Sequence, residues 1–254
     1  MSQIPFIVAI PARMAATRLP GKPLQAIAGE PMVLHVARRA LAAGASQVVV
    51  ATDDARIARA LAGQPLRVVM TRADHASGSD RLAECAELLG WPDDAVIVNL
   101  QGDEPLAPPS GIRAVAECLV QGSSAMATLA TPLADVEELL NPNCVKVVVS
   151  AAGSALYFSR APIPWPRQAF ATSRNALPAG MPFLRHIGIY AYRAAFLRTF
   201  ATLAATPLEH TESLEQLRAL EHGHSIAVRI APEPFPAGVD TPEDLARVQR
   251  LLQQ

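Results

Sequence analysis

Cysteine is scarce in this sequence, and its spacing excludes two kinds of site. The 254 residues include three cysteines, Cys85, Cys118 and Cys144, an odd number at wide intervals. Such spacing suits neither a disulfide framework nor a zinc site, whose ligands usually come in close pairs. We therefore expect these cysteines to be small buried residues of a protein in a reducing cytoplasm.

Long apolar runs and an excess of charge are also missing. No stretch approaches the roughly 18 to 20 apolar residues that span a bilayer. The start, Met1 to Pro5, lacks a basic region followed by a long apolar core, so we expect no secretion signal. The formal net charge of -1 argues against a general nucleic-acid or membrane surface, because those partners require an excess of Lys and Arg. We expect neither partner, and any polyanion site should be local.

Up to residue 131, continuous apolar runs alternate with segments whose apolar residues recur at helical spacing. The expected strands are 6–10, 48–52, 66–70, 95–100 and 126–131, and the expected helices are 31–44, 53–61, 80–89 and 109–120. This order is typical of an α/β fold with a doubly wound, mostly parallel sheet covered on both faces. Ligands of such sheets bind beyond the carboxyl ends of the strands. The loops 11–23, 71–79 and 101–105 should therefore meet at one mouth.

The pattern changes in the second half of the chain. Two short strand-like pieces, 145–149 and 155–158, precede a proline-rich, irregular stretch from Pro162 to Pro182. Because this stretch has little periodicity with which to pack, we expect an inserted lobe or a subunit contact with a mobile segment. The chain is predicted to be a single domain, 1–254, with an embellishment at about 144–205.

Regular patterns return near the end of the chain. They predict a strand at 187–192, a helix at 194–203, helical structure over 207–221, a strand at 226–230 and a helix that starts at Thr241. At this last start, Thr241 is the expected cap, proline follows it, and an acid stands three residues after the cap.

A basic loop follows the first expected strand. Between Ile10 and Pro23 it carries Arg13, Arg18 and Lys22, together with Gly21 and three prolines. A shaped turn with three cations predicts a polyphosphate site, and the alternative is a solvated basic loop. The loop is not a Walker A motif, because proline follows Lys22 and the upstream glycine is missing, and it is not a dinucleotide-binding fingerprint.

Two aspartates stand at the ends of expected elements. Asp103 lies in Gln101–Pro105, directly after the most apolar strand, where a cation bridging phosphates would be held, although Asp-Glu-Pro also occurs in ordinary turns. Asp240 precedes the helix start at Thr241, and its alternative role is in the cap of that helix. Because magnesium takes one or two carboxylates plus phosphate and water oxygens, the two aspartates together predict a Mg²⁺ site.

Other polar segments are less specific. The loop from Thr71 to Arg81 has small and polar side chains suited to the edge of a base, or equally to a helix start capped by Ser77 or Ser79. The segments 184–190 and 212–218 offer polar groups for a hydroxyl-rich ligand. A His or Tyr in such places is more often a satisfied structural residue.

Six blocks of the sequence together resemble the 3-deoxy-manno-octulosonate (Kdo) cytidylyltransferases, also called CMP-Kdo synthetases. The blocks are 10–23, 101–105, 158–165, 184–190, 212–218 and 238–244. The similarity covers essentially the whole chain, and several blocks are long and ordered. The departures lie mainly in Pro166–Met181, whose role stays open. The resemblance implies a three-layer α/β/α fold of nucleotidyltransferase type.

The activity that this resemblance implies is transfer of CMP from CTP to the anomeric hydroxyl of Kdo, with release of pyrophosphate. It also implies a cytoplasmic, magnesium-dependent enzyme of lipopolysaccharide assembly, typically a homodimer. The attacking sugar carries its own carboxylate beside the nucleophile, so cations must neutralise like charge before an oxygen can approach the α-phosphate.

Matched positions assign residues to the nucleotide and the metal. The residues that would hold the triphosphate and act in catalysis are Arg13, Arg18 and Lys22, with Lys22 placed for the leaving pyrophosphate. Those assigned to the cytosine are Arg72, Ser77 and Gly78. Magnesium would be held by Asp103, which is also assigned to catalysis, and by Asp240.

The matched positions for the sugar come from several segments. They are Gln101, Arg160, His186, Tyr190, Glu215 and Gln216. Among them Arg160 is the expected partner of the sugar carboxylate. The resemblance also implies that the embellishment at about 144–205 contributes to sugar binding and to the dimer contact.

Two alternatives stay open. One is a cytidylyltransferase for another acidic sugar, such as a sialic acid or an amino-substituted octulosonate, with the same fold and metal; the blocks from 184 to 218 favour the octulosonate. The other is a non-catalytic nucleotide-sensing module. Asp103 and Asp240 argue against it, because a sensor has no need of a second metal carboxylate.

Overall fold

The apolar runs of the first half of the chain form the middle of a sheet, as the sequence predicts. The computed structural model describes residues 4–15 and 19–252. Its elements up to residue 132 are β1 (Ile7–Ala12), η1 (Lys22–Leu24), β2 (Ala26–Ile27), β3 (Glu30–Pro31), α1 (Met32–Ala42), β4 (Gln47–Thr52), α2 (Ala55–Ala60), β5 (Arg67–Met70), α3 (Gly78–Leu88), β6 (Val96–Asn99), α4 (Pro109–Gln121) and β7 (Met126–Pro132).

The second half of the chain adds further strands and several short helices. They are α5 (Val136–Leu140), β8 (Lys146–Val149), β9 (Ala155–Ser159), α6 (Arg167–Thr172), β10 (Leu184–Arg193), α7 (Ala194–Thr202), α8 (Pro207–Glu212), α9 (Gln216–Glu221), β11 (Ile226–Ile230) and α10 (Pro242–Leu252). The expectation of continuous helical structure over 207–221 is wrong. Ser213 has a φ of 52°, in the left-handed region that an α-helix cannot continue, so two helices form in its place.

The strands form a mixed sheet in the order β11-β7-β10-β6-β1-β4-β5. β10 is antiparallel to β6 and β7, and the other strands of this row run parallel to one another. The chain places β4 and β5 on one side of β1 and β6 on the other, so the order reverses between β1 and β6. This confirms the doubly wound, mostly parallel α/β fold, and it opens a crevice at the carboxyl ends of β1 and β6.

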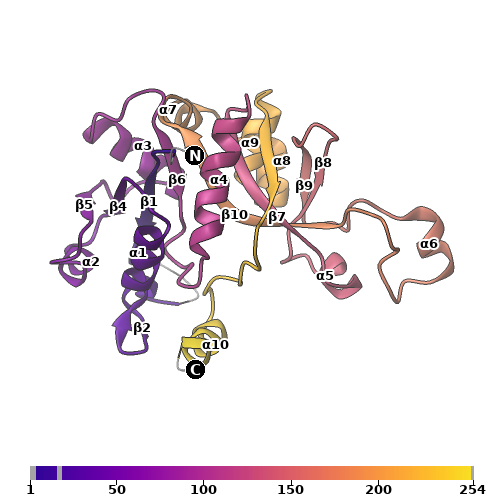
Figure 1. Cartoon of the computed structure of the whole chain (residues 1–254), viewed down its shortest axis with the longest axis horizontal. Helices are drawn as coiled ribbons and strands as arrows, with labels where there is room; N and C mark the ends of the chain where they lie inside the picture. The colour runs from indigo at the N-terminus through magenta and orange to yellow at the C-terminus, as the bar shows by residue number, and fades with distance from the viewer. Residues whose placement is uncertain (1–3, 16–18, 253–254) are drawn as a thin grey trace.

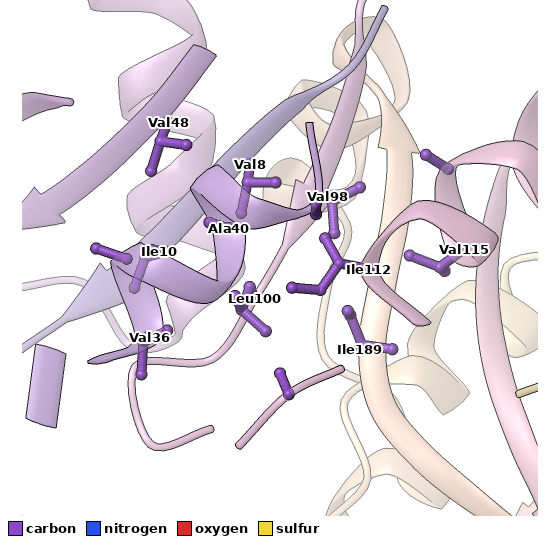
Figure 2. Packing of buried hydrophobic residues seen from close by; sticks show 14 of the residues in the cluster. Val8, Ile10, Val36, Ala40, Val48, Val98, Leu100, Ile112, Val115 and Ile189 are labelled. Carbon is purple, nitrogen blue, oxygen red and sulfur yellow. The ribbon is translucent and has the colours of Figure 1, made fainter. Parts of the chain in front are cut away.

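Helices cover both faces of this sheet. Along β1, Val8 and Ile10 point to one face and Ala9 to the other, the alternation that a pleated strand imposes. Figure 2 shows the first face, where Val8 and Ile10 pack with Val36 of α1 and Ile112 of α4. Helices α3 and α7 cover the opposite face. Burial of each such valine or isoleucine side chain contributes about 1.5 to 3 kcal/mol to the stability of the fold. The ends of β1 and β6 at the crevice are therefore held in place by a packed core.

An arm, defined here as residues 133–144 and 161–183, extends away from the sheet with α6 near its tip (Figure 1). It has a small apolar cluster of its own, which includes Leu139, Phe170 and Phe183. Within the segment 144–205 that the sequence sets apart, β10 lies inside the main sheet and α7 packs on it, so only part of the segment projects.

The C-terminal helix α10 packs beside the β2–β3 hairpin (Figure 1), and its cap is the one predicted from Thr241. The Asp244 backbone N–H donates to the Thr241 hydroxyl at 3.2 Å, and the Thr241 N–H donates to the Asp244 carboxylate at 3.1 Å. Cys85, Cys118 and Cys144 are free thiols, and Cys85 and Cys144 are buried. None of the helices in the described ranges is long and apolar enough to cross a membrane.

Candidate active site

A cavity of about 380 Å³ opens in the crevice between β1 and β6. Its walls come from the loops that follow these two strands, from the start of α3, and from the segment before α10. The lining residues are Pro11, Ala12, Arg13, Ala15, Leu19, Lys22, Pro23, Ser77, Gly78, Arg81, Gln101, Gly102, Asp103 and Asp240. Parts of all three loops expected at one mouth therefore line this cavity.

Lys22 joins the two aspartates that the sequence predicts as metal ligands. Its Nζ donates to Asp103 Oδ2 at 2.7 Å and to Asp240 Oδ1 at 2.8 Å. Burial acts to lower the pKa of Lys22, but Asp103 and Asp240 outweigh it and raise the pKa. The ammonium is therefore charged at neutral pH, and it lies between two carboxylates from distant parts of the chain.

Close backbone approaches bring these carboxylates together. The Val239 N–H donates to the Asp103 carbonyl at 2.8 Å, which places Asp240 beside Asp103. Gly102 is required at the same turn, because a Cβ there would lie 2.8 Å from the Pro11 carbonyl. Glycine thus lets the loop after β6 lie directly against the end of β1.

The donor set fits a magnesium ion. A cation, the Lys22 ammonium, already lies between the Asp103 and Asp240 carboxylates. Among the residues that the structure describes, no group of three or more His, Cys, Asp or Glu side chains could hold a metal. Magnesium needs only one or two carboxylates when phosphate and water supply the other oxygens. The two aspartates therefore suit an ion that binds together with a phosphate-bearing ligand.

The start of α3 forms a wall of the cavity that suits an anion. Ser77 is the helix cap, and it forms a capping box with Asp80. Gly78 lies close to Pro11, since a Cβ there would be 3.1 Å from the proline ring. The N-terminus of this helix, with its partial positive charge, faces the same cavity as Lys22 and the exposed Arg13.

Two residues assigned to the nucleotide are not seen in this wall. Arg18 lies outside the described residues. Arg72 is exposed, does not line the cavity, and its Nε lies 3.4 Å from Asp74 Oδ1. Its assignment to cytosine stays a prediction.

Arg81 is a cavity residue that the sequence interpretation missed. Its side chain is 2% exposed, donates to the Thr71 hydroxyl and to the Arg72 carbonyl, and lies 3.5 Å from an Asp53 oxygen. The sequence contains a sign that Arg81 is buried, because Arg81 lies one turn before the buried Cys85 on the apolar side of its helix. A charged residue on such a face is buried only when it is paired.

Glu215 and Gln216 lie at the start of α9, next to the first turn of α3. The Ser79 hydroxyl donates to Glu215 Oε2 at 3.3 Å. Among the described residues, Glu215 Oε1 and Gln216 Nε2 are buried without a hydrogen-bond partner. Burial raises the pKa of Glu215. Because buried polar atoms are nearly always paired, these two atoms are candidate contacts for a polar ligand. Nearby, Gln101 lines the cavity and donates to Asn99 Oδ1 at 3.2 Å.

His186 and Tyr190 lie on β10. His186 Nε2 lies 3.0 Å from the Thr128 hydroxyl, and the imidazole packs edge-on against Phe158 and beside Tyr190. Burial, helped by Arg185, lowers the pKa of His186 to about 3, so the ring is neutral. Burial also raises the pKa of Tyr190. Neither residue lines the cavity, and both keep their assignment to the sugar as a prediction.

The Arg160 side chain donates hydrogen bonds to backbone carbonyls of the protein. Its Nε donates to the Glu212 carbonyl at 2.7 Å, and its two terminal nitrogens donate to the carbonyls of Pro142 and Ser213 at 3.0 and 3.4 Å. The guanidinium therefore joins the arm to the break between α8 and α9. A contact with a sugar carboxylate, which the sequence predicts for Arg160, would have to use its remaining N–H groups.

These features define a class of protein. An α/β sheet with a cavity at its switch point, lined by cations, a helix N-terminus and two carboxylates, suits a nucleoside polyphosphate with a divalent cation. The family model described as Cytidylyltransferase matches residues 7–226. The chain belongs to this family, among the 3-deoxy-manno-octulosonate cytidylyltransferases.

Curated relatives carry that name. The enzyme of Stenotrophomonas maltophilia strain K279a is 63% identical over 249 residues, which cover 98% of this chain and 97% of the relative. The one from Xylella fastidiosa strain M12 is 59% identical over 251 residues, with 98% and 97% covered. A solved structure of CMP:2-keto-3-deoxy-manno-octonic acid synthetase complexed with CTP superposes with a TM-score of 0.89 at 40% identity, covering 99% of both chains.

Proposed function

We propose that this chain transfers CMP from CTP to the anomeric hydroxyl of Kdo and releases pyrophosphate, in the cytoplasmic assembly of lipopolysaccharide. The observation that carries the proposal is the contact of Lys22 with Asp103 and Asp240 at the cavity. The relatives' name supports Kdo as the acceptor, and the CTP in the similar solved structure supports the donor.

The residues of the cavity perform this transfer by positioning and by charge. The sugar hydroxyl gives up its proton to solvent and its oxygen forms a bond to the α-phosphorus, while the bond from that phosphorus to the bridging oxygen breaks and pyrophosphate leaves. Lys22 and Arg13 stabilise the negative charge that grows on the departing pyrophosphate, and the start of α3 offers N–H groups to phosphate oxygens. No covalent intermediate with the protein is needed.

Magnesium is part of the proposal. Asp103 and Asp240 would hold it, and when bound it would supply positive charge beside the phosphate and sugar oxygens. Lys22 would then transfer its contacts from the carboxylates to phosphate. The support is the chemistry of the two carboxylates and the cation that already lies between them.

The decisive experiment measures pyrophosphate release. CTP, ATP, GTP and UTP should each be tested with Kdo, a sialic acid and an amino-substituted octulosonate, with and without magnesium. We expect rapid release with CTP and Kdo only when magnesium is present. Absence of release with this pair would refute the proposal, and faster release with another acidic sugar would identify the alternative substrate.

A homodimer is the proposed assembly. The exposed apolar side chains Leu156, Trp165 and Met181 lie on β9 and on the arm, where a partner would cover them. Light scattering should give a mass about twice that of one chain. A mass equal to one chain would exclude the dimer without affecting the proposed reaction.

A further inference from the structure

The turn between α8 and α9 is held in an unfavourable backbone conformation. Ser213 has a φ of 52°, in the left-handed region that residues other than glycine seldom adopt. Two residues later α9 begins, with Glu215 and Gln216 at its start. The geometry of this turn therefore decides where the polar atoms of Glu215 and Gln216 lie, and surrounding contacts must hold it.

Glu212, the last residue of α8, supplies those contacts. Its Oε1 accepts from the Ser159 hydroxyl at 2.5 Å and its Oε2 from the Arg160 N–H at 2.9 Å. The Arg160 Nε donates in return to the Glu212 carbonyl at 2.7 Å. Side chain and backbone of one residue thus bind the end of β9, which lies beside α8 in Figure 1.

The end of β9 that Glu212 contacts is also held by Lys146. Lys146 is fully buried, and its Nζ donates to the carbonyls of Asn141 and Arg160 at 2.8 Å each. Burial acts to raise the pKa of Glu212, but hydrogen bonds from Ser159, Arg160 and Tyr157 outweigh it and lower the pKa. Glu212 is therefore a charged acceptor held against a rigid strand end.

We propose that Glu212 is a positioning residue for the acceptor sugar, acting through the start of α9. Glu212 fixes the turn at Ser213, and the turn holds Glu215 Oε1 and Gln216 Nε2, which are buried without partners among the described residues, ready for the ligand. This inference rests on the proposed function. It predicts a larger effect of Glu212 on the sugar than on the nucleotide, because Lys22 and Asp103 make their contacts without α8 and only the Ser79–Glu215 hydrogen bond described above leads from α9 to the start of α3.

The test compares Glu212→Ala and Glu212→Gln with Thr211→Ala. Thr211 is the exposed neighbour on the same helix, so its variant is a matched control. Glu212→Ala should raise KM for Kdo about tenfold, with KM for CTP within about twofold of the parent. Glu212→Gln should recover part of this loss, because its amide oxygen still accepts one of the two hydrogen bonds. Thr211→Ala should match the parent.

A second measurement does not depend on activity. Amide hydrogen exchange should become faster at 213–217 in Glu212→Ala and stay unchanged in Thr211→Ala. Equal changes in both KM values, or an unchanged KM for Kdo in an active enzyme, would overturn the inference. Should the parent itself release no pyrophosphate from CTP and Kdo, the proposed function fails, and unchanged exchange at 213–217 would then overturn the inference separately.

Discussion

The two halves of the site are built differently. The half proposed for the nucleotide, called the nucleotide half here, surrounds an open cavity at the ends of β1 and β6. It comprises Arg13, Lys22, the start of α3, Asp103 and Asp240. The assigned sugar residues outside that cavity, Arg160, His186, Tyr190, Glu215 and Gln216, form the sugar half. They lie where β9, β10 and α9 meet, and several are bonded to the protein itself.

Because of this difference, the two halves would contribute to the reaction in different ways. Asp103 follows the buried strand β6, and hydrogen bonds from Lys22 hold Asp103 and Asp240 together, so these three residues are preorganised for charge stabilisation. The sugar half already has internal hydrogen bonds, such as those of Arg160, so a ligand there must use the remaining polar atoms or exchange existing bonds. Substitutions should therefore affect turnover most in the first half and sugar affinity or stability in the second.

The largest effect is expected for Asp103→Ala. Removal of one predicted metal ligand should lower turnover by about 10³-fold or more, with a thermal midpoint close to that of the parent, because Asp103 lies at the cavity surface. Asp240→Ala should behave similarly. Steady-state pyrophosphate release at saturating magnesium measures the loss. Full activity in either variant would disprove the metal assignment.

Lys22→Ala should have the next largest effect. We expect turnover to fall by about 10²-fold, because a cation for the leaving pyrophosphate is lost. The variant also leaves the carboxylates of Asp103 and Asp240 without the ammonium between them. Magnesium should therefore raise its thermal midpoint more than that of the parent. A variant with the parent's rate and CTP affinity would show that the basic loop is a solvated surface loop and not a phosphate site.

The smallest effect concerns His186 in the sugar half. Its folded pKa of about 3 lies below the ordinary histidine pKa of 6.5, so between these two pH values the unfolded chain binds a proton that the folded protein does not. Stability from this residue is complete above pH 6.5 and is lost as pH falls toward 3, with a slope of at most about 1.4 kcal/mol per pH unit.

His186→Gln should remove that slope. Urea unfolding at intervals over this acidic range should show a flatter pH dependence for His186→Gln than for the parent, while His210→Gln, at an exposed position of α8, should follow the parent. If the parent and His186→Gln lose stability in parallel, the imidazole is not the buried neutral group described above.

Local sequence patterns were sufficient to predict the strands and helices that bury a continuous apolar surface. The strand before the basic loop and the helix cap at Thr241 were predicted from neighbouring residues alone, and both are confirmed. The helical spacing of leucines gave a wrong prediction at Ser213. That spacing continues on both sides of Ser213, but the backbone conformation of Ser213 depends on contacts with the end of β9. Arg81 was missed for a related reason, since its partners Thr71 and Asp53 come from other elements.

By itself, the sequence determined the order of strands and helices, the basic loop, the two aspartates and the family resemblance, because each is encoded in the local succession of residues. Only the tertiary structure decided that Lys22 lies between Asp103 and Asp240 and that Glu212 joins α8 to β9. Such pairings depend on how the chain crosses the sheet and on the close approach that Gly102 permits. Contacts between residues so distant in the chain arise only when the core has packed.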